Sequence, residues 1–234
     1  MNDRDRRLHG LTTPRAAAIA GVAFALLFGT AVVLIRLALP EGAEHGTQWM
    51  TGEAGKLNVA AVLMPFAGIM FLWFIGVVRD GLGRFEDKFF SSVFLGSGLL
   101  FLAMIFASAA VGEALVASRG AVTAGTGSTE LRAFGASLVT TLSNTYALRM
   151  GAVFMISLAT IWLKTRLMPQ WLVFTTYLLA VVLLIAGDVS LWLTMAFPCW
   201  VLLVSLLALV RAGIIDLHHA DDVTPGAVPP PDTA

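Results

Sequence analysis

The residue in this chain whose type and position could carry chemistry is Arg149, because it lies inside a long apolar stretch that has no other charge. Ser137, Thr141 and Thr145 precede it at intervals of four, and this spacing places all four side chains on one face of a helix. Asn144 adds a further polar group in the same turns. A charge within a bilayer is costly and faces a protein interior or a water-filled cavity. The pattern therefore predicts a polar stripe directed into a helical bundle.

Three further charged residues lie at the ends of apolar stretches. Arg36 closes the first stretch, Glu113 closes the third, and Asp188 occupies the turn between the last two. Because helical side chains lean toward the N-terminus of their own helix, charges on antiparallel neighbours can reach a common level. We expect one buried polar layer in the outer half of the membrane, formed by Arg149, Asp188, Glu113, Arg36, Thr145, Thr141 and Asn144.

Two interpretations of this layer are open. At helical rise, Arg149 lies about 22 Å from Lys164, which is about 8 Å below the outer edge of a hydrocarbon core about 30 Å thick. In the first interpretation the layer binds or gates an ion or small anion that enters from outside. In the second, Arg149 snorkels to the outer headgroups, or pairs with Asp188 or Glu113 and holds the helices together.

The apolar stretches lack the residues that catalysis or cofactor binding requires. All four histidines lie outside them: His9, His45, His218 and His219. The run Leu95-Gly96-Ser97-Gly98 invites comparison with an intramembrane serine protease, but Leu95 replaces the first glycine and no stretch contains a histidine base. We therefore expect no catalytic residues, no metal and no cofactor. The single cysteine, Cys199, excludes an intrachain disulfide.

The elements that position these residues are predicted to be membrane helices. Hydrophobic residues make up 58% of the 234 positions and charged residues 13%, whereas soluble domains have about 45–50% and about 25%. Six stretches of roughly 20 residues or more are each long enough to cross a bilayer as a helix. The predicted fold is an all-α polytopic bundle in one domain, with spans at about 16–38, 57–78, 89–113, 136–163, 167–187 and 189–210.

Lysine and arginine predict how the bundle is threaded. Ten of them fall in the N-terminal tail, the second and fourth loops and the end of the last helix, and three fall in the opposite loops. The positive-inside rule then puts both termini in the cytoplasm. Residues 1–15 are predicted to form a cytoplasmic tail, and residues 213–234, which contain Pro229–Pro231, a disordered cytoplasmic tail.

Two features indicate how the helices pack. Small residues at intervals of four form a stripe on the first helix: Ala17, Gly21, Ala25 and Gly29. Such a stripe allows close helix packing, either within the chain or across a homodimer. Pro198 lies inside the last stretch and predicts a kink there.

Two segments resemble parts of uncharacterised bacterial multi-pass membrane proteins. They are Glu86–Phe90, continuing through Val93–Phe101, and Phe197–Val201. The resemblance covers about a fifth of the chain; it implies a bacterial plasma membrane and brings no activity or functional residues.

From the residues we expect a non-enzymatic integral membrane protein, such as an accessory or assembly component. The alternative is a small ion or solute channel or transporter that uses the polar layer around Arg149. The expected partners are the lipid bilayer and a second copy or another membrane protein. A formal net charge of zero argues against nucleic acid.

Overall fold

The computed structural model describes residues 3–38, 54–82, 88–117, 126–166, 168–186 and 191–211, and all regular structure within them is helical. The helices are α1 (Asp3–Ala38), α3 (Ala54–Leu82), α4 (Lys88–Ala117), α5 (Thr126–Thr140), α6 (Leu148–Thr165), α7 (Gln170–Ala186) and α8 (Ala196–Arg211). A π-helical segment, η2 (Thr141–Ala147), joins α5 to α6, and a 3₁₀ segment, η3 (Leu191–Met195), leads into α8. The predicted C-terminal tail lies outside the described residues.

Within the described ranges, five helical segments have the length and apolar composition of membrane spans. They are Ala16–Ile35, Gly55–Asp80, Phe89–Leu115, Ala133–Thr165 and Trp192–Arg211. The remaining apolar helix, α7, has 17 residues, which at helical rise is about 25 Å against a core of about 30 Å. The predicted all-helical fold is therefore confirmed, with five helices of spanning length and one shorter apolar helix.

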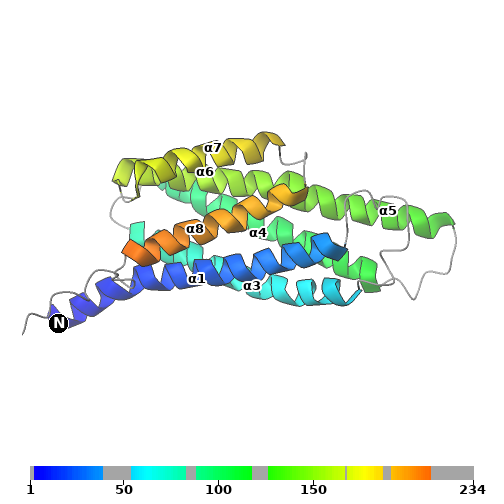
Figure 1. The fold of residues 1–234 in the computed structure, drawn as a ribbon, viewed down its shortest axis with the longest axis horizontal. Helices are drawn as coiled ribbons and strands as arrows, with labels where there is room; N and C mark the ends of the chain where they lie inside the picture. Colours follow the sequence, from blue (N-terminus) through cyan, green and yellow to red (C-terminus); the bar gives the residue numbers. More distant parts are fainter. Residues whose placement is uncertain are drawn as a thin grey trace, which may run out of the picture.

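The helices form an elongated bundle in which the first helix begins at the end where the last described helix finishes. Figure 1 shows that α1 begins and α8 ends at the same end, while α5 extends beyond the other helices at the opposite end. The α5 helix begins at Thr126, ten residues before the predicted start of that span at about 136. The sequence underestimates its length because Thr126–Arg132 is polar, and a helix outside the hydrocarbon core needs no apolar composition.

The interior of the bundle is built mainly from phenylalanine. Phe71 of α3 is fully buried, and its ring lies 4.6 Å from that of Phe24 and 5.4 Å from that of Phe154, centroid to centroid. The other rings within about 6 Å of Phe71 belong to Phe74, Phe101 and Phe197. We call these six residues the phenylalanine core: Phe24, Phe71, Phe74, Phe101, Phe154 and Phe197. They come from α1, α3, α4, α6 and α8, so one cluster joins five helices.

Helix α7 lies on the outside of the bundle, against α6 (Figure 1). Leu172, Val173, Thr176, Ala180 and Leu183 are its buried residues, and their spacing defines one helical face. The opposite face is also apolar but exposed, with Phe174 and Leu178 among its residues. A helix that is apolar on both faces is suited to lipid rather than to water.

The sequence predicted that Pro198 would kink the last helix in its interior, but the structure places it elsewhere. It is the third residue of α8 and follows the 3₁₀ segment η3. Because η3 runs directly into α8, the N–H that proline lacks is missing from the junction of the two segments and not from the middle of α8. The break in this span therefore lies before Pro198, at the change from 3₁₀ to α geometry.

Candidate functional site

The helix that carries Arg149 is irregular where its polar residues are concentrated. Residues 141–147 form the π-helical segment η2, a rare geometry that is found frequently at functional sites. Hydroxyl groups around it bond to carbonyls of the preceding turn: Thr140 Oγ1 donates to the Ala136 carbonyl at 3.0 Å and Ser143 Oγ to the Val139 carbonyl at 2.8 Å. Such side-chain bonds compete with the helical ladder and bend helices. The Ser- and Thr-rich composition thus favours an irregular turn here.

A second helix anchors this irregular turn. Ser108 Oγ of α4 donates to the Val139 carbonyl at 3.0 Å, so this oxygen accepts two hydroxyl groups. A carbonyl has two lone pairs and can do so. The bond fixes Ser108 and Val139 at one level of the bundle.

The neighbouring irregular segment, η3, meets η2 through side chains. Thr194 Oγ1 donates to Asn144 Oδ1 at 3.3 Å, and both residues are buried, with 3% and 4% exposure. Ser143 Oγ also lies 3.3 Å from Asn144 Oδ1, but its single proton has a shorter bond to the Val139 carbonyl. Thr194 is therefore the principal hydroxyl donor to the Asn144 carbonyl oxygen. We call this Asn144–Thr194 pair the polar junction.

The polar junction lies where two backbone ladders are disturbed. Pro198 has no N–H, so it cannot donate to the carbonyl of Thr194 four residues earlier. On the other helix, a π-helical turn shifts the ladder from i→i+4 to i→i+5 bonding. A buried amide paired with a hydroxyl thus joins two segments that both depart from regular α-helical hydrogen bonding.

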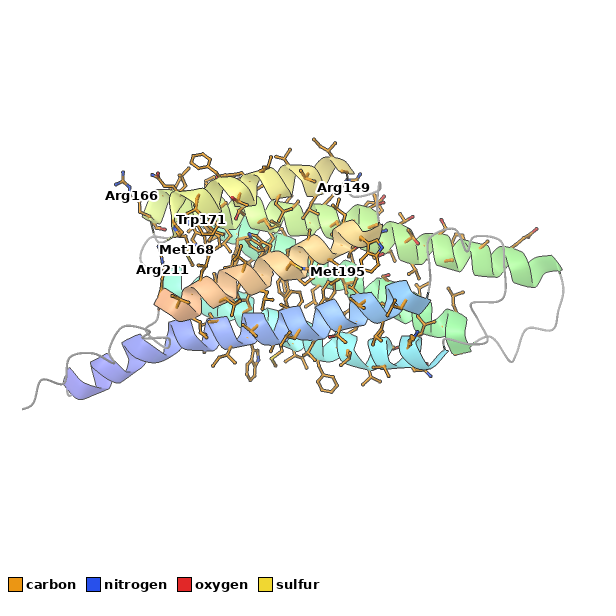
Figure 2. The ribbon with its side chains drawn as sticks, in the orientation of Figure 1. Arg149, Arg166, Met168, Trp171, Met195 and Arg211 are labelled. Carbon is orange, nitrogen blue, oxygen red and sulfur yellow. The ribbon has the colours of Figure 1, made fainter. Side chains whose placement is uncertain are left out.

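Arg149 is half-buried and folds back on its own helix. Its Nη1 donates to the Thr145 carbonyl at 3.1 Å, which is one turn nearer the N-terminus of that helix. This is the direction in which helical side chains lean. Figure 2 shows Arg149 toward the end of the bundle opposite to Arg166 and Arg211.

The predicted stripe does not face the interior. Ser137 is exposed, Thr141, Thr145 and Arg149 are half-buried, and Asn144 is buried. The inward face continues from Asn144 through apolar and small residues: Ala147, Leu148, Gly151 and Ala152. Thr141, Thr145 and Arg149 thus share one direction, at the half-buried edge of the helix, and the fully inward direction belongs to Asn144, Leu148 and Ala152 at the same four-residue spacing.

Glu113 does not belong to the layer around Arg149. Because Ser108 bonds to Val139, these two residues mark one level of the bundle. Glu113 lies five residues beyond Ser108 and is exposed, whereas Arg149 lies ten residues from Val139 in the opposite direction. At 1.5 Å per residue the two levels are about 20 Å apart, too far for an ion pair. The side chain of Arg36 and the whole of Asp188 lie outside the described part of the chain.

The small-residue stripe of α1 lies inside the bundle, where Ala17, Gly21, Ala25 and Gly29 are all buried. A Cβ atom added at Gly21 would meet the Ser205 hydroxyl of α8 and the Phe74 ring of α3, and one at Gly29 would lie 3.8 Å from the Met195 Cε. The stripe thus faces α3, α8 and η3 of the same chain.

Besides the Ser108–Val139 bond, three hydrogen bonds between side chains of different helical segments were not predicted from the sequence. Thr194 is one. The second is Trp200 Nε1, which donates to Thr176 Oγ1 at 2.9 Å and joins α8 to α7. The third is the Thr160–Tyr177 pair at 2.7 Å between α6 and α7, where Tyr177 donates because the Thr160 hydroxyl proton lies on the Ile156 carbonyl. The sequence could have indicated Thr194, because it lies four residues before Pro198.

The polar junction can be tested by a double-mutant cycle. We expect Asn144→Leu and Thr194→Val together to destabilise the protein by about 1 kcal/mol less than the sum of the single changes, because an interhelical hydrogen bond in a membrane protein contributes about 0.6–1.7 kcal/mol. The measurement is reversible unfolding in mixed micelles.

The control for this cycle pairs Asn144→Leu with Thr160→Val. Thr160 bonds to Tyr177 at a distant level of the bundle, so these two changes should be additive within about 0.5 kcal/mol. Additivity of Asn144→Leu with Thr194→Val would contradict the polar junction.

The chemistry available at the site is hydrogen bonding and charge stabilisation. Among the described residues, no group of three or more histidine, cysteine, aspartate or glutamate residues is placed to hold a metal ion. The polar junction offers an amide and a hydroxyl, and Arg149 offers a cation about one to two turns away along the same helix. Comparison of the chain with protein-family models, with curated proteins and with solved structures finds no match.

Proposed function

We propose that this protein is a non-enzymatic, multi-pass protein of a bacterial plasma membrane that acts as an accessory or assembly component. The observation that carries the proposal is the phenylalanine core. Five helices contribute to one continuous set of packed rings, which fills the centre of the bundle with apolar groups. A solid aromatic interior supports the role of a rigid scaffold that presents its outer surface to lipid and to another membrane protein.

In this proposal the chain crosses the membrane six times, with both termini in the cytoplasm. The ten lysine and arginine residues on one side support that orientation. Helix α7 is the sixth span, and a local thinning of the bilayer by a few ångströms accommodates its length. Reporter fusions test this: both termini and a fusion within residues 166–169 should report the cytoplasm, and a terminus on each side of the membrane would contradict six spans.

The assembly role predicts a defined complex. Protein extracted from its own membrane in mild detergent should form a complex with another membrane protein at a fixed ratio, measured as the mass of the intact assembly. Alanine changes on the exposed apolar surface should dissociate this complex without lowering the stability of the bundle. A monomer that conducts solute after reconstitution would contradict the role.

A second candidate function, solute transport, is favoured by the polar junction. Helices with interrupted backbones form the binding sites of many transporters near the bilayer midplane, whereas the polar junction lies close to the outer edge of the hydrocarbon core and would act as an outer binding site. Here a π-helical and a 3₁₀ segment meet at a buried amide, and Arg149 supplies a positive charge nearby. An anion is the solute class that this charge would select.

Flux measurements separate the two functions. For the assembly component we expect purified protein in liposomes to give no flux of common cations, protons or small anions above that of empty liposomes. Arg149→Ala serves as the matched variant. Anion flux in the wild type that falls at least tenfold in Arg149→Ala would establish transport through this site, whereas flux unchanged by the substitution would remove Arg149 from it.

A further inference from the structure

The turn between α6 and α7 gathers positive charge at the end of the bundle where α8 finishes. The Lys164 ammonium group lies 4.6 Å from the centroid of the Phe90 ring, which places the end of α6 against the start of α4. The Arg211 Nη1 lies 3.9 Å from the Met168 sulfur, which places the end of α8 against the turn. Figure 2 shows Arg166, Met168, Trp171 and Arg211 together at this end. We call Lys164, Arg166 and Arg211 the basic rim.

The basic rim is exposed, and the segments that form it contain no acidic residue. The side chains of Lys164, Arg166 and Arg211 are all exposed. Residues 148–186 and 191–211 include neither aspartate nor glutamate. The rim therefore places three exposed positive charges at this end of the bundle.

Arg166 has a backbone conformation that glycine adopts more easily than arginine. Its φ is 53°, in the left-handed region, and it ends α6 as the C-cap residue. Glycine is the usual residue in this conformation because it has no Cβ. A backbone outlier of this kind is a reason to look for a role of the side chain.

An apolar surface leads away from the basic rim along α7. Trp171 directly follows the turn and is 54% exposed. Phe174 and Leu178 are also exposed and lie on the same helical face, at intervals of three and four residues. Tryptophan is favoured at the boundary between headgroups and acyl chains. The surface is thus cationic at one end and apolar along the adjoining helix.

We propose that the basic rim binds the phosphate of an anionic phospholipid whose acyl chains lie along the exposed face of α7. Clusters of basic residues at the cytoplasmic ends of membrane helices recognise such headgroups, and a guanidinium can donate two parallel hydrogen bonds to a phosphate. A free anion would use only the rim, whereas a lipid satisfies the rim and the apolar face together. This inference rests on the proposed membrane placement.

Native mass spectrometry of the full chain in a neutral detergent tests the site. The probes are phosphatidylglycerol and phosphatidylcholine with identical acyl chains. We expect the wild type to prefer phosphatidylglycerol, and Arg166→Gln with Arg211→Gln to weaken its binding about tenfold or more, since each basic residue near a headgroup contributes roughly a fivefold change in affinity. Lys56→Gln with Arg132→Gln removes the same charge near the starts of α3 and α5, away from the basic rim, and should leave the affinity unchanged.

Three results would overturn the inference: equal binding of the two lipids, an equal loss in both double variants, or complete displacement of phosphatidylglycerol by excess inorganic phosphate. The last would identify a free-anion site. The unfolding midpoint of each variant shows that the fold is retained.

Reporter fusions separate the lipid site from the proposed orientation. If they place the α6–α7 turn outside while the lipid preference persists, the proposed orientation is wrong and the lipid site stands. Loss of the preference with the turn in the cytoplasm overturns the lipid site alone.

Discussion

Phe71→Ala is expected to destabilise the protein by about 3 kcal/mol. Phe71 is fully buried at the centre of the phenylalanine core, with its ring centroid 4.6–6.3 Å from five others. Truncation of a buried phenylalanine in a water-soluble protein costs about 3–5 kcal/mol, as lost transfer energy and as a cavity. In a bilayer the transfer part is smaller because the unfolded helices already lie in lipid. The lost ring contacts and the cavity remain, which sets the estimate at the lower end.

Phe66→Ala is the matched control for this prediction. Phe66 lies on the same helix but is 56% exposed, so its ring contacts lipid rather than other rings. Its removal should change the free energy of unfolding by less than about 0.5 kcal/mol. Phe71→Leu should lie between the two, because leucine keeps much of the volume. Equal effects of the two alanine substitutions would show that the core is not packed as described.

The spans were predictable because lipid imposes a simple rule on sequence. Every backbone polar group in the hydrocarbon must be bonded within a helix, so a long apolar run indicates a span without any knowledge of tertiary packing. Residues 16–38 and 89–113 illustrate this, since each predicted span lies within the observed α1 or α4. Helix ends outside the hydrocarbon follow no such rule, and the extension of α5 to Thr126 was not foreseen for that reason.

The candidate site was predictable only in part. Asn144 was identified as polar within an apolar stretch, and it does lie at the polar junction. Its partner Thr194 was missed because it lies 50 residues away, and the pairing depends on how two irregular segments meet. The direction of Arg149 along its helix follows from side-chain geometry, but its place at the edge of the inward face does not. That place depends on tertiary packing, which buries Asn144 and Leu148 and leaves Thr145 and Arg149 half-buried beside them.

The glycines of the bundle allow a test in which one substitution has opposite signs at two positions. A Cβ atom added at Gly76 of α3 meets nothing within 4 Å. Gly76→Ala should therefore be neutral or stabilise the protein by up to about 1 kcal/mol, since alanine is the better helix former. At Gly21 the same gain in helix propensity is opposed by the contacts of α1 with α3 and α8.

Gly21→Ala is expected to destabilise the protein by about 2 kcal/mol. The new Cβ would lie 2.8 Å from Cδ2 of Phe74 and would also meet the Ser205 hydroxyl oxygen. That hydroxyl has no hydrogen-bond partner among the described residues and can rotate toward a carbonyl of its own helix, so it yields easily. Phe74 is buried in the phenylalanine core and cannot. The cost of overpacking, about 1–3 kcal/mol, then exceeds the gain in helix propensity.

Ser205→Ala should accordingly rescue Gly21→Ala only slightly, whereas Phe74→Leu should rescue it substantially when unfolding is measured in mixed micelles. Full rescue by Ser205→Ala would show that the hydroxyl, rather than the ring, sets the distance between α1 and its neighbours.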